Sequence, residues 1–268
     1  MTRRSMGTPT IKTVAELAKT SPSTASRALA NYPHVREEVR NRVIHAAQVL
    51  HYTGSRSTEP NAELRTMASV PDYPARGRME AVSKARIGRY VANQWIQDGD
   101  VIVLDSGTTV YEVALHLATS PIVYTYSIPL LDALSRRTVT VFCAPGRYYP
   151  PDSCNVGDYT VAFFENLTVH RAFLACHKFD VQTGPCNLHE EMDRIRRAIV
   201  EAAEEVFILA DHSKFTDAQL KPYMPLEAVR AVITDTLPDR FRQAWRTGVE
   251  LIETDSLDIA PAMGERPR

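Results

Sequence analysis

Residues 10–31, TIKTVAELAKTSPSTASRALAN, decide the fold of the first part of the chain. The stretch predicts two short helices separated by a turn. The first covers about residues 11–18, and its buried face has the helical i, i+3, i+4 spacing at Val14, Leu17 and Ala18. The second begins at Ser21-Pro22, because serine caps free helix amides and proline suits the first helical position. Its inner face is expected to consist of Ala25, Ala28 and Leu29.

The outward face of the second helix carries three short hydroxyl groups and one arginine. Short hydroxyl side chains let the backbone approach DNA closely, and an outward arginine can donate two hydrogen bonds to a guanine. We therefore expect a DNA-contacting surface made of Thr10, Ser21, Pro22, Ser23, Thr24, Ser26, Arg27 and Asn31. The alternative interpretation is a small helical bundle that only packs on a larger domain.

A third helix completes this unit. Apolar residues repeat on one helical face of the next segment, and His51-Tyr52 follow; the repeating residues are Val35, Val39, Val43, Ala46 and Leu50. The pattern predicts an all-α helix-turn-helix head over residues 1–56.

This head resembles that of LacI-type repressors. The resemblance lies in SPSTASRAL, preceded by TIKTVAELA and followed by NYPHVREEVRNRVIHAAQVLHY. Such heads usually place glycine in the turn after the first helix, where this chain has Lys19, so Lys19 adopts a left-handed conformation or the turn differs. LacI-type proteins carry a minor-groove hinge helix at about the place of residues 60–67, but the usual Ala-Arg-x-Leu run is not clean here.

Charge is distributed unevenly along the chain. Residues 1–60 contain nine Lys or Arg and four Asp or Glu, which leaves 22 basic and 28 acidic residues for the rest of a chain that has 31 and 32. Phosphate contacts supply most non-specific DNA affinity, so a basic head on an acidic body is typical of a nucleic-acid-binding protein.

Length and composition exclude several classes. The 268 residues leave room for one domain of about 180 residues behind the head, too few for the two-lobed sugar-binding module of LacI-type repressors. No apolar run approaches the roughly 20 residues that span a membrane, and no signal peptide precedes the head, so a cytoplasmic location is expected.

No metal or cofactor is expected. The four cysteines, Cys143, Cys154, Cys176 and Cys186, form no CxxC pair, so neither a zinc site nor a disulfide framework is indicated. Cys143 and Cys176 are expected to pack as small hydrophobic residues. His189-Glu190-Glu191 lacks the second histidine of HExxH and is interpreted as a solvated helix start.

Residues 53–79 are rich in Ser, Thr, Pro and charge and lack sustained periodicity. We place a linker at 57–79, a second domain at 80–257 and a tail at 258–268. In the second domain, apolar β-runs alternate with helices. Strands are expected at 101–104, 122–126, 139–142, 171–175, 206–210 and 231–234, and helices at 81–97, 110–117 and 190–204. This alternation predicts an α/β domain with a mostly parallel sheet covered on both faces.

Two loops follow strands of this sheet, and ligands bind where parallel strands end. Residues 105–109, DSGTT, combine backbone amides, hydroxyls and the start of the next helix, which suits a phosphate, although an ordinary strand-to-helix turn is the alternative. Residues 211–215, DHSKF, add the cation Lys214. His212 lies between these residues as a further candidate contact.

Residues 80–236 resemble the effector domain of DeoR-type sugar regulators. The matching segments are KARIGRYVANQWIQDGDVIVLDSGTTVYEVALHL, VYTYSIPLLDAL, RAFLACHKFDVQTG, EEMDRIRRAIVEAAEEVFILADHSKF and AVRAVITD. The resemblance implies a fold akin to ribose-5-phosphate isomerase, used as a sensor of phosphorylated sugars. It implies that Asp105 holds ligand hydroxyls and that Lys214 holds an anionic or hydroxyl group. It assigns the phosphate to Ser106, Gly107, Thr108 and Thr109, and a pocket loop to Gly146.

Three positions depart from the family pattern. Tyr126 stands where the family has asparagine, Pro145 stands where it has glycine, and Arg196-Arg197 replaces a Lys-Arg pair. A bulky Tyr126 would shrink the pocket or stack on a ligand ring.

Two functions fit these features. The first is a transcription regulator, a dimer that represses sugar or polyol genes by binding an operator in double-stranded DNA under the control of a phosphorylated sugar. The second is a sugar-phosphate isomerase or deaminase with an accessory head. Beyond Asp105 and Lys214 no second carboxylate cluster lies in the two loops, so we favour the regulator and expect no enzyme activity.

Overall fold

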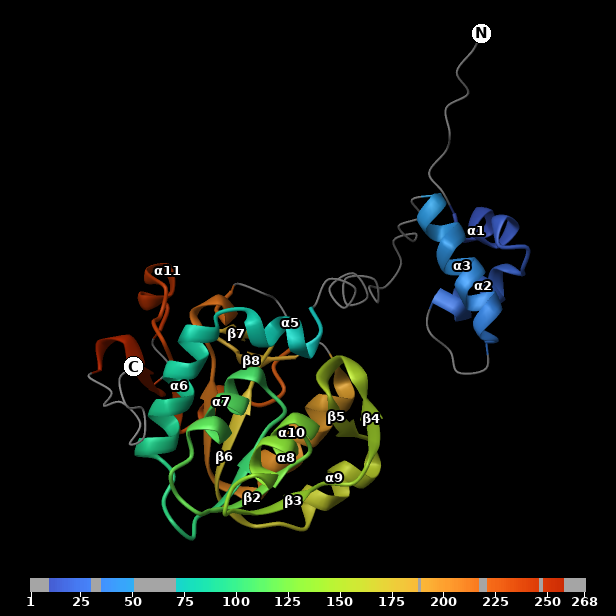
Figure 1. Ribbon diagram of the computed structural model, residues 1–268. Helices are drawn as coiled ribbons and strands as arrows, with labels where there is room; N and C mark the ends of the chain where they lie inside the picture. Colours follow the sequence, from blue (N-terminus) through green and yellow to red (C-terminus); the bar gives the residue numbers. More distant parts are fainter. Residues whose placement is uncertain are drawn as a thin grey trace, which may run out of the picture. The chain divides into compact units, whose positions relative to one another are not determined.

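The computed structural model describes residues 10–29, 35–50, 71–187, 189–216, 221–245 and 248–257 (Figure 1). The chain divides into two compact units, Met1–Ser69 and Val70–Arg268. We call the described part of the first the head and that of the second the C-terminal domain. Asn31, the predicted hinge helix at 60–67 and the predicted tail at 258–268 lie outside the described residues.

The head consists of α1 (Ile11–Leu17), α2 (Pro22–Leu29) and α3 (Glu37–Val49). Thr10 caps α1 in a capping box with Thr13, and the Ser21 hydroxyl accepts a hydrogen bond from the Thr24 amide at 3.1 Å, which confirms the predicted start of α2. Lys19 has a φ of 51°, so the turn keeps the left-handed conformation without glycine.

Small residues form the centre of the head: Val14, Ala15, Ala18, Ala25, Ala28, Val43 and Ala46. The prediction that Leu17 is buried is wrong, because Leu17 is 49 % exposed and Ala15 takes its place. The helical spacing shows which apolar residues share a face of α1. It does not show which of two adjacent faces packs against the neighbouring helices. The small side chains of Ala15 and Ala18 are compatible with close packing of the three helices.

The C-terminal domain is built on a seven-stranded sheet whose strand pairs are all parallel, in the order β11-β10-β9-β6-β1-β2-β3. This confirms the predicted α/β class. The strands are β1 (Val101–Leu104), β2 (Ile122–Thr125), β3 (Thr140–Cys143), β6 (Val169–Ala175), β9 (Ala203–Leu209), β10 (Ala231–Thr234) and β11 (Glu250–Glu253). All strands end at one edge, which we call the carboxyl edge.

Helices cover both faces of the sheet, as Figure 1 shows. Ile102 and Leu104 of β1 pack in one apolar cluster, and Val103 between them packs in the other, since successive side chains of a strand point to opposite faces. The first cluster contains side chains of α6 (Ala81–Gln94), α7 (Thr108–His116) and α8 (Ile128–Ser135). The second contains side chains of α9 (Asp158–Glu165), α10 (Glu190–Ala202) and α11 (Asp239–Arg242).

Smaller elements lie beside the sheet. Two antiparallel pairs are formed by β4 (Arg147–Tyr149) with β5 (Cys154–Val156) and by β7 (Lys178–Asp180) with β8 (Gly184–Cys186). Single 3-10 turns are Pro150–Asp152, His212–Lys214, Leu226–Ala228 and Thr254–Ser256. The helix α5 (Tyr73–Arg78) lies within the stretch that was predicted as linker, and Asp72 caps its start.

The predicted elements of the C-terminal domain are present, with ends shifted by at most three residues. Further features of this domain were not among the predicted elements: α5, α8, α9, α11, β11 and the two antiparallel strand pairs. Among the described helices, none is long and apolar enough to cross a bilayer.

The four cysteines are free thiols, and three of them are buried. Burial raises the pKa of Cys176 to about 12, so this thiol stays protonated and packs as a hydrophobic group, as expected. Cys143 is half-buried instead.

Candidate DNA-reading helix and effector site

The outward face of α2 presents the residues that the sequence predicted for DNA contact. Ser21, Pro22, Ser23, Ser26 and Arg27 are exposed, and Thr24 is half-buried. The hydroxyl of Ser21 lies 3.0 Å from that of Ser23 and 2.8 Å from that of Thr24, so these hydroxyls form one network at the start of the helix. Among the described residues, Arg27 has no hydrogen-bond or ion-pair partner, and its guanidinium is available to a ligand.

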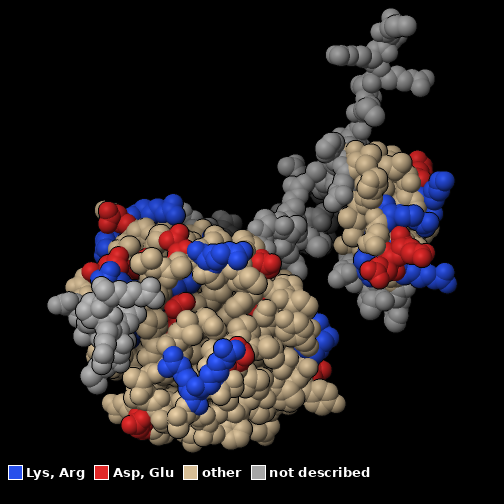
Figure 2. Space-filling model, viewed as in Figure 1, with Lys and Arg blue, Asp and Glu red and all other residues tan. Residues whose placement is uncertain are grey.

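Hydrogen bonds from α3 hold the end of α2 in place. Arg40 of α3 donates to the carbonyl of Ala28 at 3.3 Å and to that of Val35 at 3.4 Å, which holds the end of α2 against α3. In the view of Figure 2, basic and acidic side chains lie near one another on the head.

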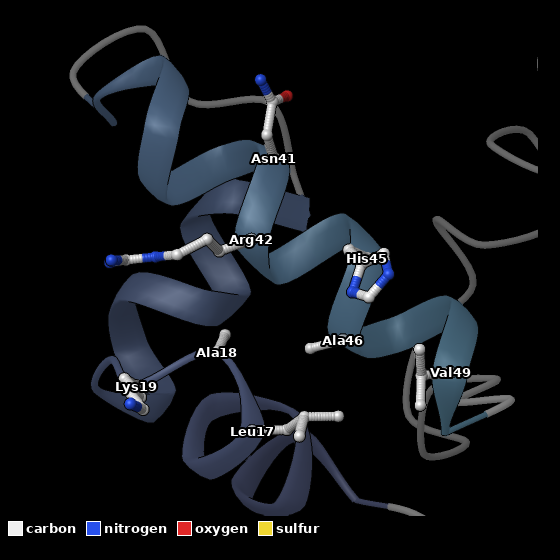
Figure 3. Close-up of a pocket in the computed structure, with 8 residues that line it drawn as sticks. All are labelled: Leu17, Ala18, Lys19, Asn41, Arg42, His45, Ala46 and Val49. Atoms are coloured by element: carbon white, nitrogen blue, oxygen red, sulfur yellow. The ribbon is translucent and has the colours of Figure 1, made fainter.

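A groove of about 560 Å³ opens on the head between α1 and α3. It is lined by Leu17, Ala18, Lys19, Asn41, Arg42, His45, Ala46 and Val49. Figure 3 shows Leu17 and Ala46 directed toward the groove, while the guanidinium of Arg42 extends away from it. None of the predicted DNA-contacting residues lines it, so this groove and the exposed face of α2 are separate surfaces.

In the C-terminal domain, Asp105 follows β1 at the carboxyl edge and is fully buried. Its Oδ1 accepts hydrogen bonds from the Ser106 amide at 2.8 Å and from the Tyr126 hydroxyl. Its Oδ2 accepts hydrogen bonds from the Ala175 amide and from Nε of Arg196, and it forms an ion pair with Nη2 of Arg196, each at 2.8 Å. Both oxygens are thus fully used within the protein. A ligand hydroxyl that binds Asp105 has to displace one of these donors.

Two of the departures from the family pattern, Tyr126 and Arg196, therefore meet at Asp105. The Tyr126 ring is fully buried and packs edge-on against Phe164, with ring centroids 5.8 Å apart. Burial raises the pKa of Tyr126, and the Asp105 charge raises it further, so the hydroxyl remains a donor. In this conformation Tyr126 fills the space beside Asp105.

The loop after Asp105 leads into α7. Gly107 is required there, because a Cβ atom would lie 2.3 Å from the Cβ of Ala175. Within the described part of the chain, no side chain caps the start of α7, and the hydroxyl of buried Ser106 has no hydrogen-bond partner. Amides and the positive end of the helix dipole thus remain available to an anion beside Thr108 and Thr109.

The second predicted loop follows β9. Asp211 is buried and accepts a hydrogen bond from the Ser213 amide at 3.0 Å, while Lys214 is half-buried and forms no ion pair with another described residue. The sheet order places β6 between β1 and β9. The two loops therefore lie on the same edge at a strand separation of about 10 Å, a distance that a phosphorylated sugar can span.

Gly146 follows β3 and packs against α9. A Cβ atom there would lie 2.2 Å from Oγ1 of Thr160 and 2.8 Å from the carbonyl of Val156, so only glycine fits. The position is required for packing. Its predicted role in a ligand loop stays a prediction.

Sequence reasoning missed a group of polar residues at the carboxyl edge. Arg76 of α5 pairs with the buried Asp152 at 2.5 Å, and Nδ1 of His177 lies 2.5 Å from Oδ1 of Asn187. His177 comes two residues after the end of β6, so the rule that ligands bind where parallel strands end could have found it. That rule could not have identified Arg76 and Asp152, because neither residue follows a strand of the parallel sheet.

A buried lysine also escaped prediction. Lys84 of α6 donates to the carbonyls of Arg76, at 3.0 Å, and of Met79, and its Nζ lies 3.6 Å from Oδ2 of Asp211. Burial lowers the pKa of Lys84, and the Asp211 charge partly offsets that shift. Lys84 therefore ties α5 to the loop that carries Lys214.

The helix start at residues 189–191 is partly solvated, as predicted. Glu190 is exposed and Glu191 pairs with Arg147 at 2.8 Å, whereas His189 packs against Tyr149 at 5.4 Å between ring centroids. Within the described residues no group of three His, Cys, Asp or Glu side chains could hold a metal ion.

His212 forms a titratable pair with Asp235. Its Nδ1 lies 2.5 Å from Oδ2 of Asp235, and its Nε2 lies 3.6 Å from Glu80. The hydrogen bond to Asp235 raises the pKa of His212 above its ordinary value of 6.5, although burial opposes the shift. A raised folded-state pKa adds stability that is complete below the unfolded pKa and is lost as pH rises through the folded pKa.

We therefore expect the free energy of unfolding of the parent protein to fall as pH rises above 6.5 through the folded-state pKa of His212. The His212→Gln variant should lack this part of the pH dependence, because glutamine does not titrate. Urea unfolding of both proteins at a series of pH values measures it. If the variant has the same pH dependence as the parent, the His212–Asp235 pair does not contribute to the pH dependence of the free energy of unfolding.

A three-helix head with an exposed polar second helix, followed by an α/β domain with two polar loops at the carboxyl edge of its parallel sheet, is typical of ligand-controlled DNA-binding regulators. Comparison with known proteins agrees. Residues 79–236 match the DeoR C terminal sensor domain, and residues 10–55 match the bacterial regulatory proteins of the lacI family. The chain belongs to the family of transcription regulators that carry the DeoR C-terminal sensor domain.

Two curated relatives illustrate the similarity. The HTH-type transcriptional repressor GlcR of Bacillus subtilis (strain 168) is 33% identical over 188 residues, which cover 67% of this chain and 71% of the relative. The HTH-type transcriptional regulator IolR of the same organism is 28% identical over 164 residues, covering 60% and 65%.

Two solved structures show weaker likeness. Ribose 5 phosphate isomerase A from Neisseria gonorrhoeae has 13% identity and a TM-score of 0.38, covering 51% of this chain and 54% of that one. The probable sor operon regulator from Shigella flexneri has 11% identity and a TM-score of 0.37, covering 58% and 85%. These TM-scores are too low for any conclusion about function.

Proposed function

We propose that this transcription regulator represses genes of sugar or polyol metabolism and that a phosphorylated sugar or related metabolite controls its affinity for an operator in double-stranded DNA. The observation that carries the proposal is the pair of loops at the carboxyl edge. The start of α7 at Thr108 lies on one side of β6, and Lys214 lies on the other; no described residue caps that helix start with its side chain or pairs with the Lys214 ammonium. Both groups favour an anionic ligand.

The operator is expected to be a near-palindrome that two heads read together. A single head places only one short helix, α2, with its exposed Ser23, Ser26 and Arg27, on the DNA. Helix-turn-helix proteins of this size gain operator length through two-fold symmetry. We therefore propose a homodimer, in which the effector changes how the two heads engage the half-sites.

An isomerase or deaminase function is less well supported. Such a reaction needs a general base that is free to accept a proton from the substrate. The buried carboxylate of the loop at residues 105–109 is Asp105; its two oxygens already accept hydrogen bonds from the protein, and Arg196 forms an ion pair with one of them. We expect no turnover of ribose 5-phosphate or hexosamine 6-phosphates. Robust catalysis in a coupled assay would overturn the choice of regulator over enzyme.

The proposed function predicts that the Lys214→Ala and Thr108→Ala variants bind the operator like the parent but no longer respond to the effector. The reason is that both substitutions act in the C-terminal domain, whereas base contacts come from α2. The measurement is fluorescence anisotropy with an operator obtained by random-site selection, titrated with phosphorylated sugars and polyols.

Lys221→Ala is the matched control, because Lys221 is an exposed lysine that belongs to neither predicted loop. This variant should respond like the parent. If Lys214→Ala and Thr108→Ala also respond like the parent, the effector binds elsewhere.

A further inference from the structure

We call residues 105–109 the anion loop. Beside it lies a buried polar cluster whose members come from distant segments of the chain. Arg76 belongs to α5, Asp152 to the turn between β4 and β5, His177 to the loop after β6, and Asn187 to the segment before α10. Asp152 and Asn187 are 2 % and 7 % exposed. The rings of His177 and His189 pack edge-on with centroids 6.2 Å apart, and the charges of Asp152, Arg76 and Arg196 act on the pKa values of both histidines. Five charged or polar side chains therefore lie around His177 in one region of the carboxyl edge: Arg76, Asp152, Asn187, His189 and Arg196.

Among the residues that the structure describes, three buried atoms in this cluster have no hydrogen-bond partner: Oδ2 of Asp152, Nδ2 of Asn187 and Nη1 of Arg196. The other polar atoms of these three side chains already have partners in the protein. Oδ1 of Asp152 is taken by Arg76, and Nε and Nη2 of Arg196 are taken by Asp105. Burial lowers the pKa of His177, so its ring is neutral, and its Nδ1 donates to Oδ1 of Asn187.

An unpaired buried polar atom costs about 1–3 kcal/mol, so three in one cluster are unfavourable unless a ligand or solvent satisfies them. The three atoms are one acceptor and two donors. A hydroxyl group donates and accepts, and therefore fits both kinds. A second phosphate does not fit, because the Asp152 carboxylate would repel it.

From this arrangement we propose that Asp152, Asn187 and Arg196 form a subsite for the hydroxyl-bearing end of the effector, separate from the anion loop at residues 105–109. The proposal rests on the proposed function and specifies its ligand as a molecule with one phosphate at one end and hydroxyl groups at the other. Asp105 then serves to hold Arg196 and Tyr126 in place. Because Arg76 occupies the other oxygen of Asp152, the bound hydroxyls lie next to α5, the first described helix of the C-terminal domain.

The test measures dissociation constants by isothermal titration calorimetry on the full chain. The probes are a panel of phosphorylated tetroses to hexoses and their polyol phosphates, together with inorganic phosphate. The variants are Asn187→Ala and the isosteric Asp152→Asn, which keeps one oxygen for Arg76. Asn166→Ala is the matched control, because Asn166 is exposed at the end of α9 and bonds only to the Ala162 carbonyl among the described residues.

We expect each subsite variant to weaken the tightest phosphorylated probe by about tenfold, the value of one hydrogen bond to a buried polar group, and to leave inorganic phosphate binding unchanged. Thr108→Ala should weaken both kinds of probe, and Asn166→Ala neither. Circular dichroism and thermal unfolding confirm that each variant is folded. Equal loss of phosphate binding in Asn187→Ala and Asp152→Asn would overturn the separation of the two sites.

Two further outcomes are distinguishable. If a phosphorylated probe binds the parent and both folded subsite variants equally well, the subsite is wrong and the proposed function stands. If no phosphorylated probe in the panel binds the parent, the proposed function fails, and the subsite fails with it.

Discussion

Replacement of Arg196 by methionine is expected to lower the free energy of unfolding of the C-terminal domain by about 3–5 kcal/mol. The side chains of Arg196 and Asp105 are only 3% and 0% exposed, and a hydrogen bond from Nε and an ion pair from Nη2, each of 2.8 Å, join them. Removal of the guanidinium leaves a buried carboxylate without its counter-charge, and the cost comes from that carboxylate rather than from lost packing. Urea unfolding followed by circular dichroism measures the effect.

A second substitution separates these two causes. In the double variant Asp105→Asn, Arg196→Met, no uncompensated charge remains, so much of the lost stability should return. Arg194→Met is the matched control on the same helix, because the Arg194 side chain is 51% exposed and its partner Asp158 is 85% exposed. That variant should stay within about 1 kcal/mol of the parent. If Arg196→Met has an equally small effect, the buried pair of Arg196 and Asp105 is not needed for the stability of the C-terminal domain.

Arg27→Ala is expected to reduce discrimination at one base pair of the operator half-site by about 1–3 kcal/mol while the head stays folded. Arg27 is exposed on α2 and has no hydrogen-bond or ion-pair partner among the described residues, so its loss disturbs no internal contact. Binding to a set of operators with single base changes, measured by fluorescence anisotropy at fixed salt, gives the base preference.

Arg42→Ala serves as the control for charge. Arg42 is also exposed but belongs to α3, away from the predicted reading face. Its removal should change overall affinity and the dependence on salt at most, since phosphate contacts carry no base preference. If Arg27→Ala keeps the base preference of the parent, another residue reads the operator.

Local signals in the sequence predicted part of the elements, and those that were predicted are present in the structure. The start of α2 follows from Ser21 and Pro22, because a helix cap involves residues only a few positions apart. Strand β10 coincides with its prediction at Ala231–Thr234, since a buried apolar strand is recognisable from its own composition. The same reasoning failed for Leu17, because its exposure depends on how α1 meets α2 and α3.

The candidate site was predicted only in part. The DSGTT and DHSKF loops were found because ligands bind where parallel strands end, and both loops follow strands directly. The polar cluster around His177 was not found. Arg76 and Asp152 are 76 positions apart, and nothing near either residue in the chain indicates the other.

The sequence by itself determined a three-helix head with a polar reading helix, a parallel α/β domain and the loops at its carboxyl edge. These features depend on helix caps, hydrophobic periodicity and the alternation of strands with helices along the chain, all of which are recognisable in short segments. Only the tertiary structure decided how Asp105 is used. Its donors Tyr126 and Arg196 lie 21 and 91 positions away, and the folded sheet and α10 bring all three side chains together. Burial then requires each charge to be paired, which makes Asp105 the anchor of the site.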